Sequence, residues 1–412
     1  MKNPFLLAVI LVLLFAGCTK MNQNTAQWRG KNRDGIYKES GLLKTWPAEG
    51  PKMLWETEII GNGFGSPVVY GNQLFVNGEV DSISYLFAFD LKGNLRWKSP
   101  NGPEFKGEGF SAGFPGSRST PTVYKGMVYA HSGLGRIACF DAKTGKEIWT
   151  KHMVKDLGGV CGYFGDSESL LIDGNYLYCL PGGKESNVVC LDRFTGNQVW
   201  ISNALSDPAA FNSPILITLP ERKLFVTVSR NYLMALDAKN GELLWSVKED
   251  SVKFDDEYCN TPVYYNGSIY SVSGVEKGTG AFKLQLSPDG KSVKEIWQNR
   301  AIKNLMSGFI VVDNKLYSTT KEKRLVCLDV STGSVIDSLS NQRGSLIFAD
   351  NQLYCYNDNG NMFLIGLDGG KMSVEGKFKI EKGTKEPMAH PMIHDGVLYV
   401  RHGKAVIAYQ IK

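Results

Sequence analysis

One short string returns along the chain with little change. It reads FDAKTGKEIW at 140–149, LDRFTGNQVW at 191–200 and LDAKNGELLW at 236–245. In each copy an Asp opens a tight turn that contains Gly, and a short apolar run then ends in Trp. The Asp carboxylate can accept backbone N–H groups of the turn, and Gly supplies the positive φ that such a turn needs. The string therefore predicts two strands joined by a tight turn.

The string belongs to a longer unit that occurs eight times. Further copies lie at 89–97, 286–297, 328–337 and 367–376, with a truncated copy at 405–412. Their spacing is about 40–50 residues. Each copy follows two runs of alternating apolar and polar residues, rich in β-branched and aromatic types, which predict two more strands. Four strands at this spacing are typical of a propeller blade, so we predict an all-β, eight-bladed β-propeller.

The two ends of the chain are expected to meet in one blade. The last copy stops at Lys412 without its fourth strand or its Trp, whereas LWETEII at 54–60 stands alone near the start. That strand can complete the last blade, so that the ring has no open edge. We predict one propeller domain over 47–412. Six Trp residues then share one role, as flat wedges between neighbouring sheets: Trp55, Trp97, Trp149, Trp200, Trp245 and Trp297.

The N-terminus has the layout of a secretory signal. Lys2 precedes an apolar run at 5–17, which is too short for a comfortable membrane span, and Cys18 follows directly. The FAGC junction resembles a bacterial lipobox, and a plain cleaved signal is the alternative. We expect a signal peptide at 1–17, then a lipidated Cys18 with a polar tether and N-terminal extension to residue 46. We expect a periplasm-facing anchor in the outer membrane, and exposure on the cell surface stays open.

Charge and cysteine spacing exclude several classes of protein. The formal net charge is +5 over 412 residues, with no dense run of Lys and Arg, so no nucleic-acid partner is expected. The cysteines after Cys18 form no CxxC and no adjacent pair, which excludes the usual zinc, c-type haem and redox patterns. Cys139, Cys190 and Cys327 share one repeat position and are expected to be small apolar core residues. The oxidation state of Cys161 and Cys259 is left open.

The D-x-x-x-G-x-x-x-W core of the unit resembles the pyrroloquinoline-quinone-like (PQQ-like) propeller repeat. The stretches QWRGKNRDG at 27–35, PGGK at 181–184 and NTPVYYNGSIY at 260–270 are also similar to secreted bacterial propellers of that superfamily. The resemblance covers nearly everything after the signal. It implies the fold, whereas the relatives differ in activity. They include quinoprotein dehydrogenases and a lipoprotein that helps assemble outer-membrane barrels.

The resemblance does not extend to the cofactor residues of the dehydrogenases. Those enzymes share an adjacent Cys-Cys disulfide, a Trp floor under the quinone, and Glu, Asn and Asp calcium ligands beside a catalytic Asp. This chain has no adjacent Cys pair, its Trp residues are assigned to blade closure, and no matching ligand set is found. We therefore expect no cofactor, neither PQQ nor calcium, and no other metal.

The two faces of the predicted ring differ. The short turns within the strand pairs A–B and C–D lie on one face, which we call the turn face. The longer D–A and B–C loops lie on the other, the loop face, and variable loops on a rigid scaffold commonly carry function. The longest loop, 98–118, contains five Gly together with Phe105, Phe110 and Phe114. We expect any ligand to bind below this loop, which could close as an apolar lid.

Residues at the start of each innermost strand are expected to ring the central channel. Glu168 and His390 could move protons, and Arg343 could hold an anion. Further binding candidates are Arg118, Thr120, Asn212, Asn260 and Lys184, and Arg230, Arg401 and His402 are expected to make the rim of the loop face basic. The alternative is that Ser, Thr and Asn only cap strands and bind channel water, while the charged groups are solvated. The aligned ring consists of Ser66, Thr120, Glu168, Ser213, Thr261, Ser307, Gly344 and His390.

Two functions follow from these features. The first is a non-catalytic envelope lipoprotein that holds a protein or glycan partner on its loop face and touches the membrane only through its anchor. The second is an enzyme that acts on a small, sugar-like substrate at the channel mouth. A deep funnel in which Glu168, Arg343 and His390 converge would favour the enzyme. A large acidic or aromatic patch on the outer rim would favour the scaffold.

Overall fold

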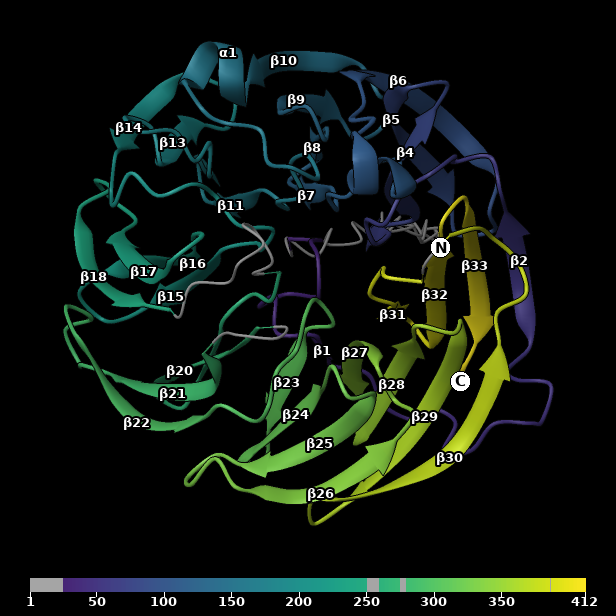
Figure 1. The fold of residues 1–412 in the computed structure, drawn as a ribbon. Coiled ribbons are helices and arrows are strands. Elements are labelled where there is room, and N and C mark those ends of the chain that lie inside the picture. Colours follow the sequence, from purple (N-terminus) through teal and green to yellow (C-terminus); the bar gives the residue numbers. More distant parts are fainter. Residues whose placement is uncertain (1–24, 250–258, 275–278, 386) are drawn as a thin grey trace, which may run out of the picture.

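Eight antiparallel sheets surround a central axis in the computed structural model, which describes residues 25–249, 259–274, 279–385 and 387–412 (Figure 1). The sheets have four strands each, and one of them gains a fifth. Helical structure among these residues is limited to α1(Met153–Leu157) and the single 3₁₀ segment η1(Gly109–Gly113). The prediction of an all-β, eight-bladed propeller is therefore confirmed. No helix in the described part of the chain is long and apolar enough to cross a membrane.

The strands of each blade follow one another from the channel outward. Blades 1 to 4 are β3(Val68–Tyr70), β4(Gln73–Val80), β5(Ile83–Asp90), β6(Leu95–Pro103); β7(Thr122–Tyr124), β8(Met127–His131), β9(Arg136–Asp141), β10(Glu147–His152); β11(Leu171–Asp173), β12(Tyr176–Cys179), β13(Val188–Asp192), β14(Gln198–Ser202); and β15(Ile215–Thr218), β16(Lys223–Val228), β17(Tyr232–Asp237), β18(Leu243–Lys248). Blades 5 to 7 are β19(Val263–Tyr265), β20(Ser268–Ser273), β21(Gly280–Leu286), β22(Val293–Asn299); β23(Phe309–Val312), β24(Lys315–Thr319), β25(Arg324–Asp329), β26(Val335–Ser340); and β27(Gly344–Ala349), β28(Gln352–Asn357), β29(Asn361–Asp368), β30(Lys371–Lys379).

Blade 8 joins the two ends of the chain, as predicted. It contains β31(Met392–His394), β32(Val397–His402), β33(Ala405–Gln410) and, as its outer strand, β2(Met53–Thr57). β2 pairs antiparallel with β33, and Trp55 lies opposite Ala408. The strand begins one residue before the predicted range of 54–60 and ends earlier. The ring is thus closed by hydrogen bonds between the N-terminal and C-terminal parts of the chain.

The recurring Trp and Gly meet across blade boundaries. The Trp200 indole N–H donates to the backbone oxygen of Ala238 in the next blade, at 3.3 Å, and its ring lies over Gly241. Gly241 has a φ of +76°, and a Cβ there would lie 2.7 Å from the indole, so Gly is required for two reasons. Four more Trp residues make the same pair of contacts with the next blade: Trp55, Trp97, Trp149 and Trp297.

Trp245 is the exception among the six predicted wedges. Its indole is buried, but its N–H has no hydrogen-bond partner among the described residues. Gly290, in the corresponding turn of the next blade, lies against Leu219 and Leu224 instead of an indole. The repeated string is therefore explained as one half of a joint between two blades, and the joint between blades 4 and 5 departs from the pattern.

We expect Trp200→Ala to lower the free energy of unfolding by roughly 3–5 kcal/mol, because it removes a packed indole together with its hydrogen bond to the Ala238 carbonyl. Urea unfolding followed by circular dichroism measures this loss. Phe194→Ala is the matched control, since Phe194 is 41% exposed in a turn and should cost little. A loss below about 1 kcal/mol for Trp200→Ala would contradict the role of the indole as a wedge.

The apolar cores lie between adjacent sheets. One cluster, for example, combines Val226 and Trp245 of blade 4 with Ile269 and Phe282 of blade 5. Cys139, Cys190 and Cys327 are fully buried in such clusters, which confirms their predicted role as small core residues. Because each sheet is covered on both faces by its neighbours, the scaffold that carries the loops is rigid.

The segment before β2 fills the channel. Ala26 pairs with Val123 close to the A–B turn of blade 2. The chain then runs toward the loop face, reverses, and returns as β1(Ile36–Tyr37), which pairs in parallel with β27 of blade 7 inside the ring (Figure 1). Residues 38–46 continue along the turn face, where the Leu42 N–H donates to Asp350. We call residues 26–37 the plug; with 38–46 it extends the packed body beyond the range of 47–412 expected from the sequence.

Two buried arginines fix the plug to the blades. Arg33 is 1% exposed and donates to the backbone oxygens of Ser169, Leu170 and Pro214, at 2.7, 2.5 and 3.2 Å. These carbonyls precede the innermost strands of blades 3 and 4. Arg29, equally buried, donates to the Phe309 oxygen in blade 6. Guanidinium groups suit this task because each presents several donors in a fixed planar arrangement.

Candidate functional site

A cavity of about 400 Å³ opens at the channel mouth on the loop face. Its walls come from loops between successive blades, and Trp28 of the plug contributes from the channel side. The cavity lies at the mouth below the longest loop, where the sequence analysis expects a ligand to bind, and ligand binding there stays a prediction. The cavity is lined by Trp28, Phe64, Phe110, Phe114, Arg118, Thr120, Phe164, Ser167, Ser169, Phe211, Ser213, Cys259, Leu305, Met306, Met388 and His390.

Aromatic side chains form one wall of the cavity. Phe164 is central, because its ring centroid lies 6.0 Å from that of Phe114, 6.2 Å from that of Phe110 and 5.7 Å from that of Phe211. Most of these pairs meet edge to face, which is the arrangement that aromatic quadrupoles favour. Phe110 is 72% exposed at the rim. The predicted lid thus contributes Phe110 and Phe114 to a cluster that also includes a second loop.

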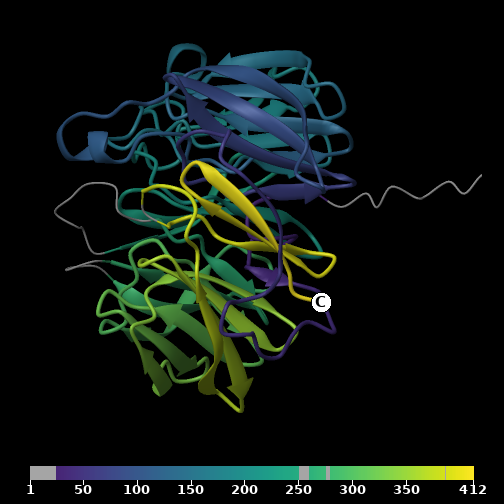
Figure 2. The same cartoon turned by 90° about the vertical axis from the view of Figure 1, so that its right-hand side faces the viewer.

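The lid loop is shorter than the sequence suggested. Residues 98–103 belong to β6, which ends at Pro103, so the loop begins at Glu104. Glu104 is buried and accepts hydrogen bonds from the Gly133 N–H at 2.6 Å and the Ser117 hydroxyl at 2.6 Å, which ties the base of the loop to blade 2. Figure 2 shows the loop, with η1 near its tip, projecting from the ring on the loop face.

Hydroxyl groups link the blades around the mouth. The backbone N–H of Ser66 donates to Thr120 Oγ1 at 2.8 Å, that of Thr120 to Ser169 Oγ at 3.0 Å, and that of Ser169 to Ser213 Oγ at 3.0 Å. The Ser213 N–H continues the series to Thr261. The ring position in blade 3 is therefore Ser169, and the sequence alignment that placed Glu168 there was wrong by one residue. Ser167, Glu168 and Ser169 are all polar, so residue type alone could not fix the register.

Glu168 instead occupies the position before the ring, where side chains hold the end of the second strand. Glu168 Oε2 accepts the Leu180 N–H at 2.9 Å, and Asn260 Nδ2 donates to the Val272 oxygen at 2.9 Å. Asn212 makes the same contact with Val228. All three side chains are at most 5% exposed. The predicted binding residues Asn212 and Asn260 are thus engaged in strand pairing, as the alternative interpretation of the ring proposed.

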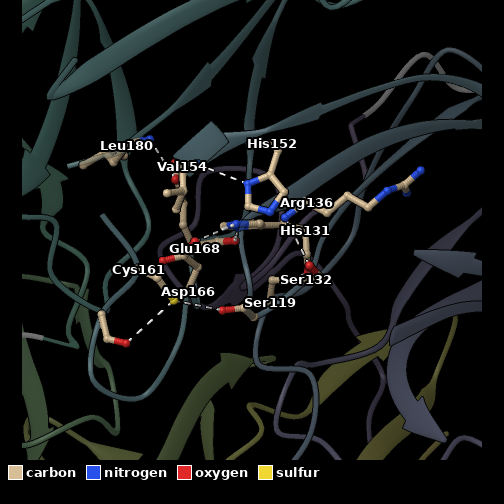
Figure 3. A network of polar contacts seen from close by, with 12 residues as sticks. Ser119, His131, Ser132, Arg136, His152, Val154, Cys161, Asp166, Glu168 and Leu180 are labelled. Atoms are coloured by element: carbon tan, nitrogen blue, oxygen red, sulfur yellow. Dashed lines mark hydrogen bonds and ion pairs between the residues drawn. The ribbon is translucent and has the colours of Figure 1, made fainter. Parts of the chain in front are cut away.

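Glu168 and His131 are buried and lie in a cluster with Asp166, which is partly exposed (Figure 3). His131 Nδ1 lies 3.2 Å from the Glu168 backbone oxygen and must donate to it, because a carbonyl only accepts. His131 Nε2 lies 3.5 Å from Asp166 Oδ2. If the His131 ring were neutral, the lone pair on Nε2 would face the negative charge of Asp166, which is unfavourable. The geometry therefore favours a proton on Nε2 as well. Burial is the largest single influence and lowers the pKa of His131, but Asp166 and Glu168 together outweigh it and the pKa is raised above its usual value.

The second carboxylate oxygen of Glu168 is buried without a hydrogen-bond partner among the described residues. Glu168 lines a separate cavity of about 20 Å³, which has room for one water molecule. Burial raises the pKa of Glu168 to about 7, although the charges of His131 and Arg33 oppose the shift. The carboxyl group is therefore close to half protonated near neutral pH.

This cluster predicts a pH dependence of stability. The pKa of Glu168 is 4.5 in its usual environment and about 7 in the fold, so the folded state binds the proton more tightly. Protonated Glu168 therefore stabilises the folded state. This contribution to the free energy of unfolding is fully present below about pH 4.5 and is lost as the pH rises to about 7, with a total of roughly 3 kcal/mol. The raised pKa of His131 acts in the same direction.

Glu168→Gln should flatten this part of the pH profile and be more stable than the parent above pH 7, because the amide stays neutral. Chemical unfolding at pH 5, 6, 7 and 8 measures the slope. Glu221→Gln, at an exposed position, is the control and should keep the parent profile. Equal slopes for Glu168→Gln and the parent would show that Glu168 is ionised in the fold.

His390 lies at the cavity in a neutral form. It is 5% exposed, and its Nε2 donates to the Ser307 oxygen at 3.1 Å. Burial, together with the positive charge of Arg29, lowers the pKa of His390 well below its usual value. The Trp28 ring meets the imidazole edge to face at 5.2 Å. With its proton on Nε2, the ring keeps an unprotonated Nδ1, which is an acceptor. Both His390 and Glu168 are buried, so the expectation that they lie at solvent was wrong.

The three charged candidates do not meet. Arg343 is 39% exposed and forms an ion pair with Asp358 at 2.7 Å, and it lines neither cavity. Glu168 and His390 line different cavities. Of the other binding candidates, Arg118 and Thr120 line the large cavity, whereas Lys184 lines neither. The funnel with converging charges that would have favoured the enzyme is not formed.

Arg401 was wrongly placed on a basic rim. It is fully buried and donates to the backbone oxygens of Gly65, Asn77 and Gly403. Trp28 was also missed as a cavity residue, although the string QWRGKNRDG had been noted for its resemblance. A signal was present, because a Trp and two Arg within seven residues are unusual in a polar tether. Phe164, Phe211, His131 and Asp166 carried no local signal of comparable strength.

Comparison with known proteins identifies the family. Residues 84–339, more than half of the chain, match the PQQ-like family described as outer membrane protein assembly factor BamB. The BamB of Moranella endobia is 23% identical over 304 residues, covering 68% of this chain and 70% of the relative. The tetrathionate hydrolase of Acidithiobacillus ferrooxidans is 24% identical over 292 residues, covering 61% of this chain. The chain spans only 54% of the length of that hydrolase.

Solved structures agree on the fold. The crystal structure of BamB from Moraxella catarrhalis superposes with a TM-score of 0.64 at 11% identity, covering 87% of this chain and 99% of the other. The quinohemoprotein alcohol dehydrogenase ADHIIG from Pseudomonas putida HK5 gives 0.63 at 12% identity, covering 95% and 80%. At such identities the likeness concerns the fold alone. On the family match, this chain belongs to the PQQ-like propeller family described as outer membrane protein assembly factor BamB.

Proposed function

We propose that this chain is an envelope scaffold that holds a partner protein at its loop face. The observation that carries the proposal is the family match over residues 84–339. The names of the BamB relatives favour a protein partner in outer membrane assembly over a glycan, which the sequence also allowed. Phe110, 72% exposed beside an open cavity, adds support, because exposed aromatic side chains near a concave surface are common anchors in protein interfaces.

The plug supports a particular orientation at the membrane. Ala26 pairs with Val123, the middle residue of the short strand β7 and two residues before the A–B turn, so the chain enters the ring from the turn face. Cys18 precedes Ala26 by eight residues, which span at most about 29 Å when extended. A lipid on Cys18 would therefore hold the turn face toward the outer membrane. The loop face would point away from it, into the periplasm.

Cys18→Ala should release the protein from the membrane fraction, because one residue carries the whole anchor. Cell fractionation with immunodetection measures the distribution. Cys161→Ala, which leaves the junction intact, should stay in the membrane fraction. Retention of the Cys18→Ala protein at the parent level would contradict the lipid anchor.

The partner surface is tested with a photo-crosslinking residue on each face. A benzoyl-phenylalanine at position 110 should capture an outer membrane assembly protein, since Phe110 lies on the loop face. The same residue at position 194 is the matched control, because Phe194 is 41% exposed on the turn face. Crosslinks that form only from position 194, or from neither position, would contradict a scaffold that uses the loop face.

Catalysis on a sugar-like substrate is the second candidate. The observation in its favour is Glu168, whose pKa is raised by burial to about 7 beside His131 and Asp166. Against it, Glu168 faces space for one water only. We also propose that the chain uses neither PQQ nor calcium. In support, no Asp or Glu is found among the described residues that line the large cavity, and calcium prefers carboxylate ligands.

A further inference from the structure

We propose that the cavity at the channel mouth binds an uncharged small molecule with an aromatic body about two or three rings in size. This binding would be additional to a scaffold role and does not depend on it. Four features support the proposal: the volume of the cavity, its walls, the state of Arg118 and His390, and the hydroxyl groups at its floor.

The volume sets the size of the ligand. Pockets of about 300–1,000 Å³ usually hold drug-sized ligands, and a cavity of about 150 Å³ already accommodates benzene. The cavity here measures about 400 Å³. One aromatic ring would leave more than half of it unfilled, whereas two or three rings fill it. The plug closes the channel side with Trp28, so a ligand enters from the loop face.

The walls favour aromatic groups. Phe114, Phe164 and Phe211 form a continuous series with interplanar angles of 77° and 72°, so ring edges and faces alternate along the surface. A further ring can join such a series edge to face, which contributes about 0.5–1.5 kcal/mol for each pair beyond burial. Met306 and Met388 lie on the same cavity. Their flexible thioethers adapt to the outline of a ligand and also contact aromatic rings favourably.

Among the described residues that line the cavity, no cationic group is left unengaged for an anionic ligand. The terminal nitrogens of Arg118 donate to the backbone oxygens of Gly116, at 2.9 Å, and of Phe114. The guanidinium also stacks on Phe64 at 5.6 Å and on Phe105 at 5.7 Å. Burial lowers the pKa of Arg118 to about 10, and the charge of Glu104 opposes this shift.

Among the described lining residues, Arg118 is cationic but its terminal nitrogens already donate to backbone oxygens, and His390 is neutral, so these residues offer an ion no unengaged partner. A charged ligand would lose its hydration without a compensating partner. The binding chemistry that remains is that of an uncharged molecule.

The floor supplies polar specificity. The hydroxyl oxygens of Thr120, Ser169 and Ser213 each accept a backbone N–H, and none of the three donates a hydrogen bond to another described residue. Their protons are available to an acceptor on the ligand. The unprotonated Nδ1 of His390 can accept from a ligand N–H or O–H. A ligand with a polar atom at one end of its aromatic body matches this distribution.

Two fluorescent probes of nearly equal shape test the proposal. N-phenyl-1-naphthylamine is uncharged and contains two aromatic units, and 8-anilino-1-naphthalenesulfonate adds one negative charge to the same frame. The full-length protein should bind the uncharged probe at one site, and at least about tenfold more tightly than the sulfonate. Fluorescence titration measures both affinities.

Matched variants locate the bound probe. Phe164→Ala should weaken the uncharged probe about tenfold. Phe110→Ala, at a side chain that is 72% exposed, should also weaken binding and cannot disturb the core. Phe194→Ala, on the turn face, should bind like the parent. Absence of binding, equal or tighter binding of the sulfonate, or parent-like binding by Phe110→Ala and a folded Phe164→Ala protein would overturn the proposal.

The same uncharged aromatic chemistry occurs in free small molecules and in apolar peptide segments. Competition with the capped dipeptide of two phenylalanines separates these sources. Displacement of the bound probe would assign the cavity to aromatic side chains of a polypeptide, and retention of the probe would assign it to a free small molecule. The crosslinking test at position 110 reports on the protein partner alone. A failure of probe binding would therefore not change the result of the crosslinking test.

Discussion

Removal of residues 405–412 should abolish the soluble, closed ring. The deletion removes β33, which lies between β32 and β2, and with it both hydrogen-bonded ladders that hold blade 8 together. It also removes the buried side chains of Val406, Ile407 and Tyr409. At roughly 1.5–3 kcal/mol for each large buried side chain, the loss approaches the whole stability of a domain, about 5–15 kcal/mol. Two unpaired strand edges would then promote aggregation.

Size-exclusion chromatography and thermal unfolding measure this outcome. Deletion of Lys412 alone is the control, because this exposed residue lies outside β33 and should be dispensable. Removal of residues 53–57 should resemble the larger deletion, since it takes away the partner strand and Trp55. A monomer with the parent melting temperature after either large deletion would contradict closure by β2 and β33.

Arg33→Met should lower the free energy of unfolding by roughly 3–5 kcal/mol, the usual cost of breaking a buried charged contact. Methionine fills a similar length but has no donors, so the carbonyls of Ser169 and Pro214 lose their partner, and that of Leu170 keeps only the Thr122 hydroxyl. An unsatisfied buried carbonyl costs about 1–3 kcal/mol. The plug should loosen as a consequence, because Arg33 joins it to two blades at once.

Urea unfolding measures the loss, and hydrogen exchange of residues 26–37 reports the loosening. Arg96→Met is the matched control: Arg96 is 60% exposed and lies 3.9 Å from Asp90, a surface pair expected to contribute at most about 1 kcal/mol. Equal stability of Arg33→Met and the parent, with unchanged hydrogen exchange in the plug, would show that the Arg33 hydrogen bonds are not needed to hold the plug.

The fold could be predicted because its determinants are local and repeated. The spacing of Asp, Gly and Trp follows from a joint in which the Gly of one blade lies under the Trp of the blade before it, as Gly241 lies under Trp200. A repeated joint appears in the sequence as a period. Closure of the ring was predictable for a related reason. The last repeat lacks its fourth strand and its Trp, and the single strand with Trp55 near the start of the chain supplies both.

The site could be predicted only in position. The channel mouth follows from the topology, but its chemistry depends on contacts between distant residues. Arg33 meets Ser169 and Pro214 across more than a hundred positions, and no local pattern announces such a contact. The placement of Glu168 was wrong by one residue because its neighbours are polar as well. Arg343 looked available in the sequence, whereas its partner Asp358 lies directly after the end of β28.

Closure by the two ends of the chain has a consequence for biogenesis. In a chain exported N-terminus first, residues 26–57 leave the membrane before β33 has been translocated. The four consecutive strands of each of blades 1 to 7 are neighbouring segments and can pair in order of emergence. β2 has its strand partner only in β33 and stays unpaired until the last residues arrive. A chain that ends after β32 but before β33 therefore presents open edges on both β2 and β32, and such edges distinguish an unfinished chain from a finished one.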